Sequence, residues 1–144
     1  MVSETRQKEF DSLYAETLRY CQVTEHNVVM ILALLLEGNP DENLKQIREE
    51  RKTLGECIHA IRDIDAKRNN PFFTKNDYHV LTSIRNERNH FVHEAYNEYL
   101  FKNGETALNS FNEEYKRLKK FHDDMLLVAR ASQNARIAAA KSKI

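Results

Sequence analysis

The stretch from Leu81 to Tyr96, LTSIRNERNHFVHEAY, repeats apolar side chains at three- and four-residue steps. An α-helix turns through about 100° per residue, so this spacing gathers the apolar side chains on one side of a helix. That side is formed by Leu81, Ile84, Phe91, Val92, Ala95 and Tyr99. We expect an amphipathic helix from Lys75 to about Lys102, opened by a capping box of Thr74 and Asp77 and ended by Asn103-Gly104.

Three other segments share this helical periodicity. They cover residues 3–37, residues 41–64 with a weak point at Gly55, and residues 108–129. Gly38-Asn39-Pro40 and the turn KRNNPFF, residues 67–73, supply breaks between helices, because Asn-Pro forces the residue before proline out of the α region. The Ala- and Lys-rich residues 132–144 are expected to fray.

Four amphipathic helices with short connections bury their apolar sides by packing side by side. The chain has 144 residues, with only three Gly, two Pro and no Trp. That size suits one domain with one core, and few breakers favour few, long helices. We therefore predict a single all-α domain over residues 1–144, built as a helical bundle.

Charge and hydropathy exclude several classes of partner. The 22 Lys and Arg balance the 22 Asp and Glu, so no global positive field favours a nucleic-acid duplex or a membrane surface. The longest apolar run, Val28 to Leu36, is too short to span a bilayer. Cys21 and Cys57 fall on apolar helical sides, where a reduced thiol behaves as a small hydrophobic group. We expect a cytoplasmic protein without a disulfide and without membrane contact.

Arg88 projects from the apolar side of the helix over residues 75–102, which is a costly place for a permanent charge. Beside it, Arg85, Asn89 and His93 follow one another at four-residue steps and form a polar line, flanked by Tyr96. Arg88 and His93 are separated by about 140° and about 7.5 Å on an ideal helix, a gap that an arginine side chain can bend across. Asn89 can hydrogen-bond the imidazole, so the three side chains can converge on one anion.

A structural interpretation of Arg88 is also open. Glu25 interrupts the apolar line of Cys21, Val28 and Leu32 on the first predicted helix, and it can pair with the guanidinium. Such a pair can serve folding alone, or it can hold Arg88 in place for a functional site.

Arg88-Asn89 and His93 resemble the signature of the HEPN superfamily, in which an Arg-Asn pair precedes a His with three residues between them. The match at residue level covers about sixteen positions, Leu81 to Tyr96. The motif also lies in the next-to-last long helix, as it does in that superfamily. The resemblance implies a four- to five-helix up-and-down bundle that dimerises through the motif helix, so that two motifs share one cleft.

Many HEPN proteins are metal-independent endoribonucleases that act as toxins or as antiviral and stress effectors, while others are non-catalytic scaffolds. The resemblance therefore implies an RNA substrate, a homodimer, no metal and no cofactor, with an antitoxin or a nucleotidyltransferase as a possible partner. Some of these toxins carry a Tyr two residues after the His as a modification site. This chain has Ala95 there and Tyr96 one place later, which departs from that pattern.

The residue chemistry agrees with this expectation. A histidine titrates near neutrality, so His93 can take the proton of a 2′-hydroxyl or return one to the leaving oxygen. The Arg88 guanidinium can stabilise the charge that gathers on the phosphate. In a symmetric dimer, Arg85 and Arg88 of both copies would supply a local positive field, and the product would be a 2′,3′-cyclic phosphate.

Other constellations have less support. His90, His93 and Glu94 have the spacing of metal ligands on a helix, but His90 is expected to point elsewhere than Asn89 and no further ligands are evident. The basic run Lys116 to Lys120 is typical of a solvated helix face, although it can add phosphate contacts near a cleft. A helical interaction module whose last helix docks a partner is a third hypothesis.

Overall fold

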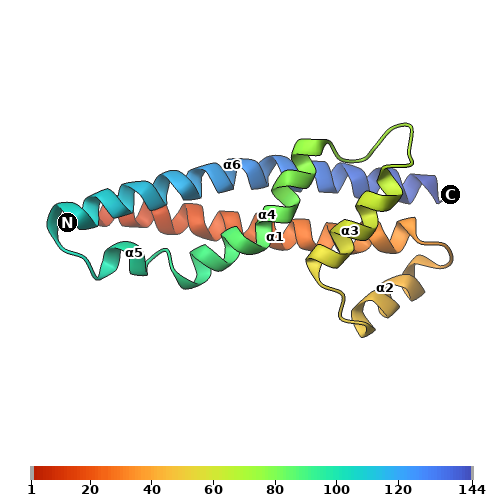
Figure 1. The fold of residues 1–144 in the computed structure, drawn as a ribbon, viewed down its shortest axis with the longest axis horizontal. Coiled ribbons are helices and arrows are strands. Elements are labelled where there is room, and N and C mark those ends of the chain that lie inside the picture. Colours follow the sequence, from red (N-terminus) through yellow and green to blue (C-terminus); the bar gives the residue numbers. More distant parts are fainter. Residues whose placement is uncertain (1, 144) are drawn as a thin grey trace. The chain divides into compact units, whose positions relative to one another are not determined.

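A computed structural model describes residues 2–143, which contain six helices and no strand. The prediction of an all-helical bundle is confirmed. Met1 and Ile144, the ends of the predicted domain, lie outside the described residues. The helices, labelled in Figure 1, are α1 (Glu4–Leu35), α2 (Pro40–Glu49), α3 (Leu54–Asp65), α4 (Lys75–His93), α5 (Asn97–Leu100) and α6 (Gly104–Ser142).

The break between α1 and α2 has the predicted chemistry. Gly38 has a positive φ of 96°, and the Asn39 side chain caps α2 by accepting hydrogen bonds from the backbone N–H groups of Asp41 and Glu42. Pro40 occupies the first turn, where its missing N–H costs nothing. The predicted helix end is therefore confirmed.

The segment 41–64, predicted as a helical stretch that could break or weaken near Gly55, is two helices, and the break lies a few residues earlier, at residues 50–53. Arg51 takes a positive φ of 52° after α2, and Thr53 then starts α3 with a capping box. The Thr53 hydroxyl accepts a hydrogen bond from the Glu56 N–H, and the Glu56 carboxylate accepts one from the Thr53 N–H. The break precedes Gly55 because this Thr-x-x-Glu pattern satisfies two N–H groups that a new helix leaves open.

The helix predicted from Lys75 to Lys102 begins as expected but ends early. Thr74 and Asp77 form the predicted capping box, with reciprocal hydrogen bonds of 2.9 and 3.1 Å. α4 ends at His93, where the N–H groups of Glu94 and Ala95 both donate to the His90 carbonyl. His93 is therefore the last residue of α4, and α5 is a separate short helix.

Residues 132–142, for which fraying is predicted, continue α6 to Ser142. Ser132, Ala135 and Ala139 are all buried. These small residues recur at three- and four-residue steps, so the end of α6 has a packed side. Lys143 also donates hydrogen bonds to the carbonyls of Leu36 and Gly38.

The helices group into two compact units. The first unit contains α1 up to Cys21 and residues Ser83–Leu126. Aromatic rings dominate its core: the Phe10 ring centroid lies 5.6 Å from that of Phe111, and Phe91 stacks on Phe121 at 5.8 Å. Such rings supply a large share of the apolar area that a small unit can bury.

Side-chain contacts give the helix directions within the first unit. Arg6 bonds Asn112 and Glu16 contacts His122, so these parts of α1 and α6 run parallel, as Figure 1 also shows. α4 runs antiparallel to α6, because Glu87 pairs with Arg117 whereas His90, further along α4, contacts the earlier residue Glu114. A parallel first and last helix departs from the simple alternation of a four-helix bundle.

The second unit contains Gln22–Thr82 and the chain from Leu127 onward. The apolar run that begins at Val28 lies in its core, and Asn27 joins α1 to α6 by donating to the Ser132 hydroxyl. Asp65 is 1% exposed and accepts hydrogen bonds from the N–H groups of Phe72 and Phe73. This carboxylate thereby fixes the turn KRNNPFF, residues 67–73.

Two further predictions concern the thiols and the membrane. Cys21 and Cys57 are both free and buried, as predicted. Across residues 2–143, no helix combines the length and the apolar character needed to cross a bilayer.

Candidate functional site

The predicted site residues lie mainly at the end of α4 in the first unit. Arg85, Asn89 and His93 are exposed and form the polar line expected beside the buried apolar side. Arg88 is half-buried, and so is Glu25, which lies on the part of α1 that belongs to the second unit. The rest of the apolar side is buried as predicted, with one correction: Val92 is 47% exposed, because it lies at the edge of that side.

Asn89 and His93 come together in an open hollow of about 390 Å³. The other lining residues are Asn86, His90 and Glu94 of α4, and Arg117 of α6. Arg85, Arg88 and Tyr96 are not among the described residues that line it. Within one chain, the hollow therefore holds the histidine of the predicted motif without its arginine.

Arg88 acts electrostatically on α1. Burial of the Cys21 thiol raises its pKa to about 11, and the positive charge of Arg88 opposes part of that rise. The guanidinium is therefore close enough to the buried thiol to stabilise its anion. This environment suits a structural arginine as well as one held ready for a ligand.

Tyr96 connects α1 to the segment between α4 and α5. Its hydroxyl donates a 2.8 Å hydrogen bond to Asp11, and its ring packs edge-on against Phe10 and Tyr14. Burial, followed by the hydrogen bond to Asp11, raises the pKa of the Tyr96 hydroxyl. Tyr96 thus has an evident structural role away from the hollow.

His90 lines the hollow although its place in the sequence did not predict it as a site residue. It was expected to point away from Asn89, but both side chains line the hollow. Its Nε2 lies 2.7 Å from Oε2 of Glu114, and its Nδ1 lies 3.4 Å from Oε2 of Glu94. A sequence signal existed, because Arg85-Asn86 and His90 repeat the spacing of Arg88-Asn89 and His93 three residues earlier.

Arg117 supplies the guanidinium that lines the hollow. Its Nε and Nη2 donate to the two carboxylate oxygens of Glu87 at 3.0 and 2.9 Å, and this pairing raises the pKa of Arg117. The guanidinium also lies 5.8 Å from the centroid of the Phe91 ring. Arg117 belongs to the basic run Lys116 to Lys120. We predicted that this run is a solvated helix face that can add phosphate contacts near a cleft.

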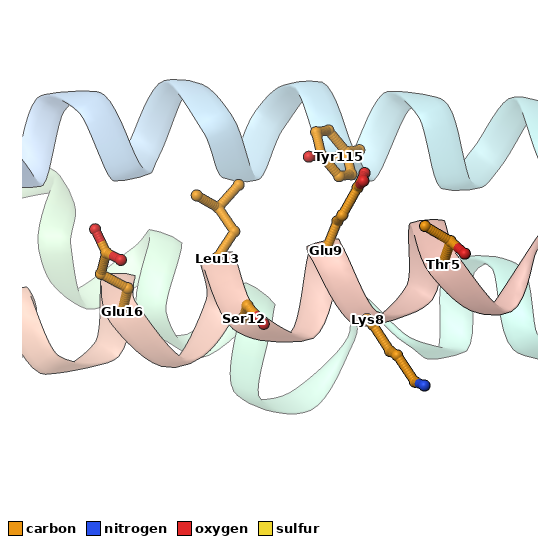
Figure 2. Close-up of a pocket in the computed structure, with 7 residues that line it drawn as sticks. All are labelled: Thr5, Lys8, Glu9, Ser12, Leu13, Glu16 and Tyr115. Atoms are coloured by element: carbon orange, nitrogen blue, oxygen red, sulfur yellow. The ribbon is translucent and has the colours of Figure 1, made fainter.

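A second surface hollow, shown in Figure 2, lies between α1 and α6 in the first unit. It has a volume of about 520 Å³ and is lined by Thr5, Lys8, Glu9, Ser12, Leu13, Glu16 and Tyr115. Leu13 and Glu9 point toward α6, whereas Lys8 points away. The Glu16 carboxylate accepts a hydrogen bond from the Tyr20 hydroxyl and contacts His122, so it is already engaged by neighbouring side chains.

Metal binding receives no support from the geometry. In residues 2–143 no three His, Cys, Asp or Glu side chains are grouped so that they could hold a metal ion. His90 uses both ring nitrogens toward carboxylates instead.

Comparisons with known protein families, curated proteins and solved structures found no match for this chain. The resemblance to HEPN proteins therefore depends on the motif residues and on the helix that carries them.

Proposed function

We propose that this chain is a metal-independent endoribonuclease of the HEPN type that acts in the cytoplasm as a homodimer. The observation that supports this most is that His93 and Asn89 of the motif are exposed together in a polar hollow beside Arg117. A titratable imidazole with a neighbouring amide and guanidinium is a suitable set for chemistry on a phosphodiester. The free state of both cysteines agrees with a reducing compartment.

The reaction we propose is attack by the 2′-oxygen of RNA on the adjacent phosphorus. The bond from phosphorus to the 5′-oxygen breaks, leaving a 2′,3′-cyclic phosphate and a 5′-hydroxyl. His93 transfers a proton in this step, and Asn89 orients the imidazole or the phosphate. Arg88 stabilises the charged phosphate from a second copy of the chain, whose α4 packs beside the first.

Exposed basic residues near the hollow provide the attraction for RNA that the net charge lacks. Arg85 lies on α4, and Lys116 and Lys119 are exposed on the same stretch of α6 as Arg117. A toxin or an antiviral or stress effector is the role we propose, with an antitoxin as regulator. Regulation by a nucleotidyltransferase has less support, because the Tyr96 hydroxyl is bonded to Asp11 and Ala95 is buried.

A non-catalytic HEPN scaffold is the second candidate. The observation that favours it is the half-buried Arg88, whose charge acts on the buried Cys21. In that case Arg88→Ala would disrupt folding or dimerisation, and the chain would show no RNA cleavage.

The test is cleavage of end-labelled RNA, both structured and unstructured, by the purified full chain in excess EDTA. We expect cleavage by the unmodified chain and a loss of about 10²- to 10⁴-fold in His93→Ala, the usual contribution of a proton-transfer group. His59→Ala is the control, because His59 is an exposed histidine on α3 in the second unit. Equal cleavage by His93→Ala and the unmodified chain would remove His93 from the site.

A further inference from the structure

We propose that His90, held by Glu114, is the second proton-transfer group of this hollow and acts as the general acid to the general base His93. This inference rests on the proposed endoribonuclease function. It assigns both proton transfers to one chain, so catalysis would not require a histidine from a second copy.

The first support is the shared position of the two imidazoles. His90 and His93 are three residues apart on α4, a spacing that places both on neighbouring parts of one helix face. Both line the same hollow, together with Asn89, which directly precedes His90 on α4, and Arg117 of α6. A phosphodiester in this hollow would therefore meet two imidazoles and one guanidinium.

The second support is how His90 is held. The His90 and Glu114 side chains are only 10% and 11% exposed, and Nε2 and Oε2 are 2.7 Å apart. A carboxylate can only accept a hydrogen bond, so the short contact fixes the proton of His90 on Nε2. Glu114 thereby orients the ring and leaves Nδ1 as the nitrogen that exchanges a proton.

The third support is the weak contact at Nδ1. The Glu94 carboxylate lies 3.4 Å away, at the long limit for a hydrogen bond, and its side chain is 66% exposed. Glu94 can therefore swing into solvent when a substrate enters. The imidazole then presents a protonated Nδ1 to the leaving oxygen while its Nε2 stays bonded to Glu114.

The proton balance of the step is complete. His93 accepts the 2′-hydroxyl proton as the 2′-oxygen bonds to phosphorus. Nδ1 of His90 donates its proton to the 5′-oxygen as that oxygen leaves, and the electron pair of the broken bond stays on the oxygen. Arg117 faces the phosphate, and Glu87 restrains it through two hydrogen bonds.

The experiment measures the cleavage of two substrates that differ in their leaving group. In an RNA dinucleotide the leaving 5′-oxygen needs a proton, whereas in a nucleoside 3′-(4-nitrophenyl phosphate) the nitrophenolate leaves as a stable anion. We expect His90→Ala to lower dinucleotide cleavage by about 10²- to 10³-fold and cleavage of the nitrophenyl ester by less than about tenfold. His93→Ala should impair both reactions, because each needs the 2′-hydroxyl proton removed.

Two further variants separate chemistry from folding. His90→Gln keeps an N–H donor for Glu114 but cannot transfer a proton, so it should match His90→Ala in activity while keeping more stability. His122→Gln is the matched control, since His122 also lies between carboxylates, Glu16 at 2.8 Å and Asp123 at 3.1 Å, but outside this hollow. We expect it to cleave both substrates at the unmodified rate.

Each outcome decides the proposal. If the His90 variants cut the dinucleotide normally while His93→Ala does not, the role of His90 is wrong and the proposed function stands. Equal losses on both substrates would make His90 a structural residue, which also overturns the inference. An unmodified chain that cuts neither substrate would remove the proposed function itself.

Discussion

Nε2 of His90 and Oε2 of Glu114 lie 2.7 Å apart and join the end of α4 to α6 within the first unit. His122 and Glu16 repeat the arrangement between α6 and α1, with a separation of 2.8 Å. Both pairs lie beside aromatic rings, because His90 contacts Phe91 and His122 contacts Tyr20. Directional polar contacts beside such rings favour one alignment of the helices over its neighbours.

Glu16→Gln should lower the stability of the chain more at neutral pH than in acid. Hydrogen bonds from His122 and then Tyr20 hold the pKa of Glu16 below its ordinary value of 4.5. A depressed pKa in the folded state contributes stability above the unfolded pKa, and that contribution is lost as pH falls through the folded pKa. Urea unfolding at about pH 7 and at about pH 3 should show a smaller difference between the variant and the unmodified chain at the lower pH.

Glu9→Gln is the control for this experiment, because Glu9 is exposed on the same part of α1. A stability difference for Glu16→Gln that is the same at both pH values would contradict the assignment.

Cys21 should react slowly with iodoacetamide in the folded chain. Burial raises the pKa of the Cys21 thiol to about 11 from an ordinary 9.0, and only the thiolate reacts. At about pH 8 the thiolate fraction is then lower by about 100-fold, before any steric protection. Mass spectrometry of the Cys57→Ala variant, with and without urea, measures this rate. Equal rates in the two conditions would show that the thiol is accessible.

The same shift predicts a loss of stability at high pH. Because the pKa of Cys21 is higher in the folded chain, the thiol of the unfolded chain ionises at a lower pH. The contribution of Cys21 to the free energy of unfolding is therefore complete below the unfolded pKa and declines as the pH rises toward about 11. Cys21→Ala should flatten this part of the stability curve.

The sequence predicted those helix limits that local chemistry sets. Asn39-Pro40 and the box of Thr74 and Asp77 lie where local hydrogen bonds decide the backbone. A break near Gly55 was predicted, but the chain turns at Arg51, because the Thr53 capping box and not the glycine sets the start of α3. No glycine or proline directly follows His93, where α4 ends, and the apolar periodicity continues into residues 95–99. The sequence therefore predicted a longer helix than the one observed.

The candidate site was predictable only in part, for a physical reason. Asn89 and His93 lie four residues apart on one helix, and helical geometry alone places them together. Glu114 is on α6, and a contact between distant segments depends on how the helices pack. The sequence therefore predicted His93 as a site residue, but it did not predict that Glu114 would hold His90.

Asp65→Asn should destabilise the chain by about 2 kcal/mol, the usual cost of leaving buried donors unsatisfied. The buried carboxylate accepts from the N–H groups of Phe72 and Phe73 and from the Tyr78 hydroxyl at 2.6 Å. An amide nitrogen in place of one oxygen would face a donor. Urea denaturation measures the change, with Asp63→Asn as control because its side chain is 68% exposed. A loss as small as that of the control would contradict the role of Asp65.

Val92→Glu should weaken the homodimer that we propose. Val92 is 47% exposed beside His93, and an isologous contact along α4 would bring the two copies of this residue close together. Two facing carboxylates repel, so we expect the dissociation constant to rise by about tenfold or more, which corresponds to about 1.4 kcal/mol. Ile137→Glu is the matched control, because Ile137 is 45% exposed but lies on α6 in the second unit.

Sedimentation equilibrium at tens of micromolar should give twice the chain mass for the unmodified chain and for Ile137→Glu, and a lower mass for Val92→Glu. RNA cleavage distinguishes the source of the phosphate-binding arginine. If Arg88 acts from the second copy, Val92→Glu should lose activity at low protein concentration and regain it at high concentration, because mass action restores the pair. If the monomer cleaves as well as the dimer, the guanidinium must come from the same chain, and Arg117 is the one that lines the hollow with His93.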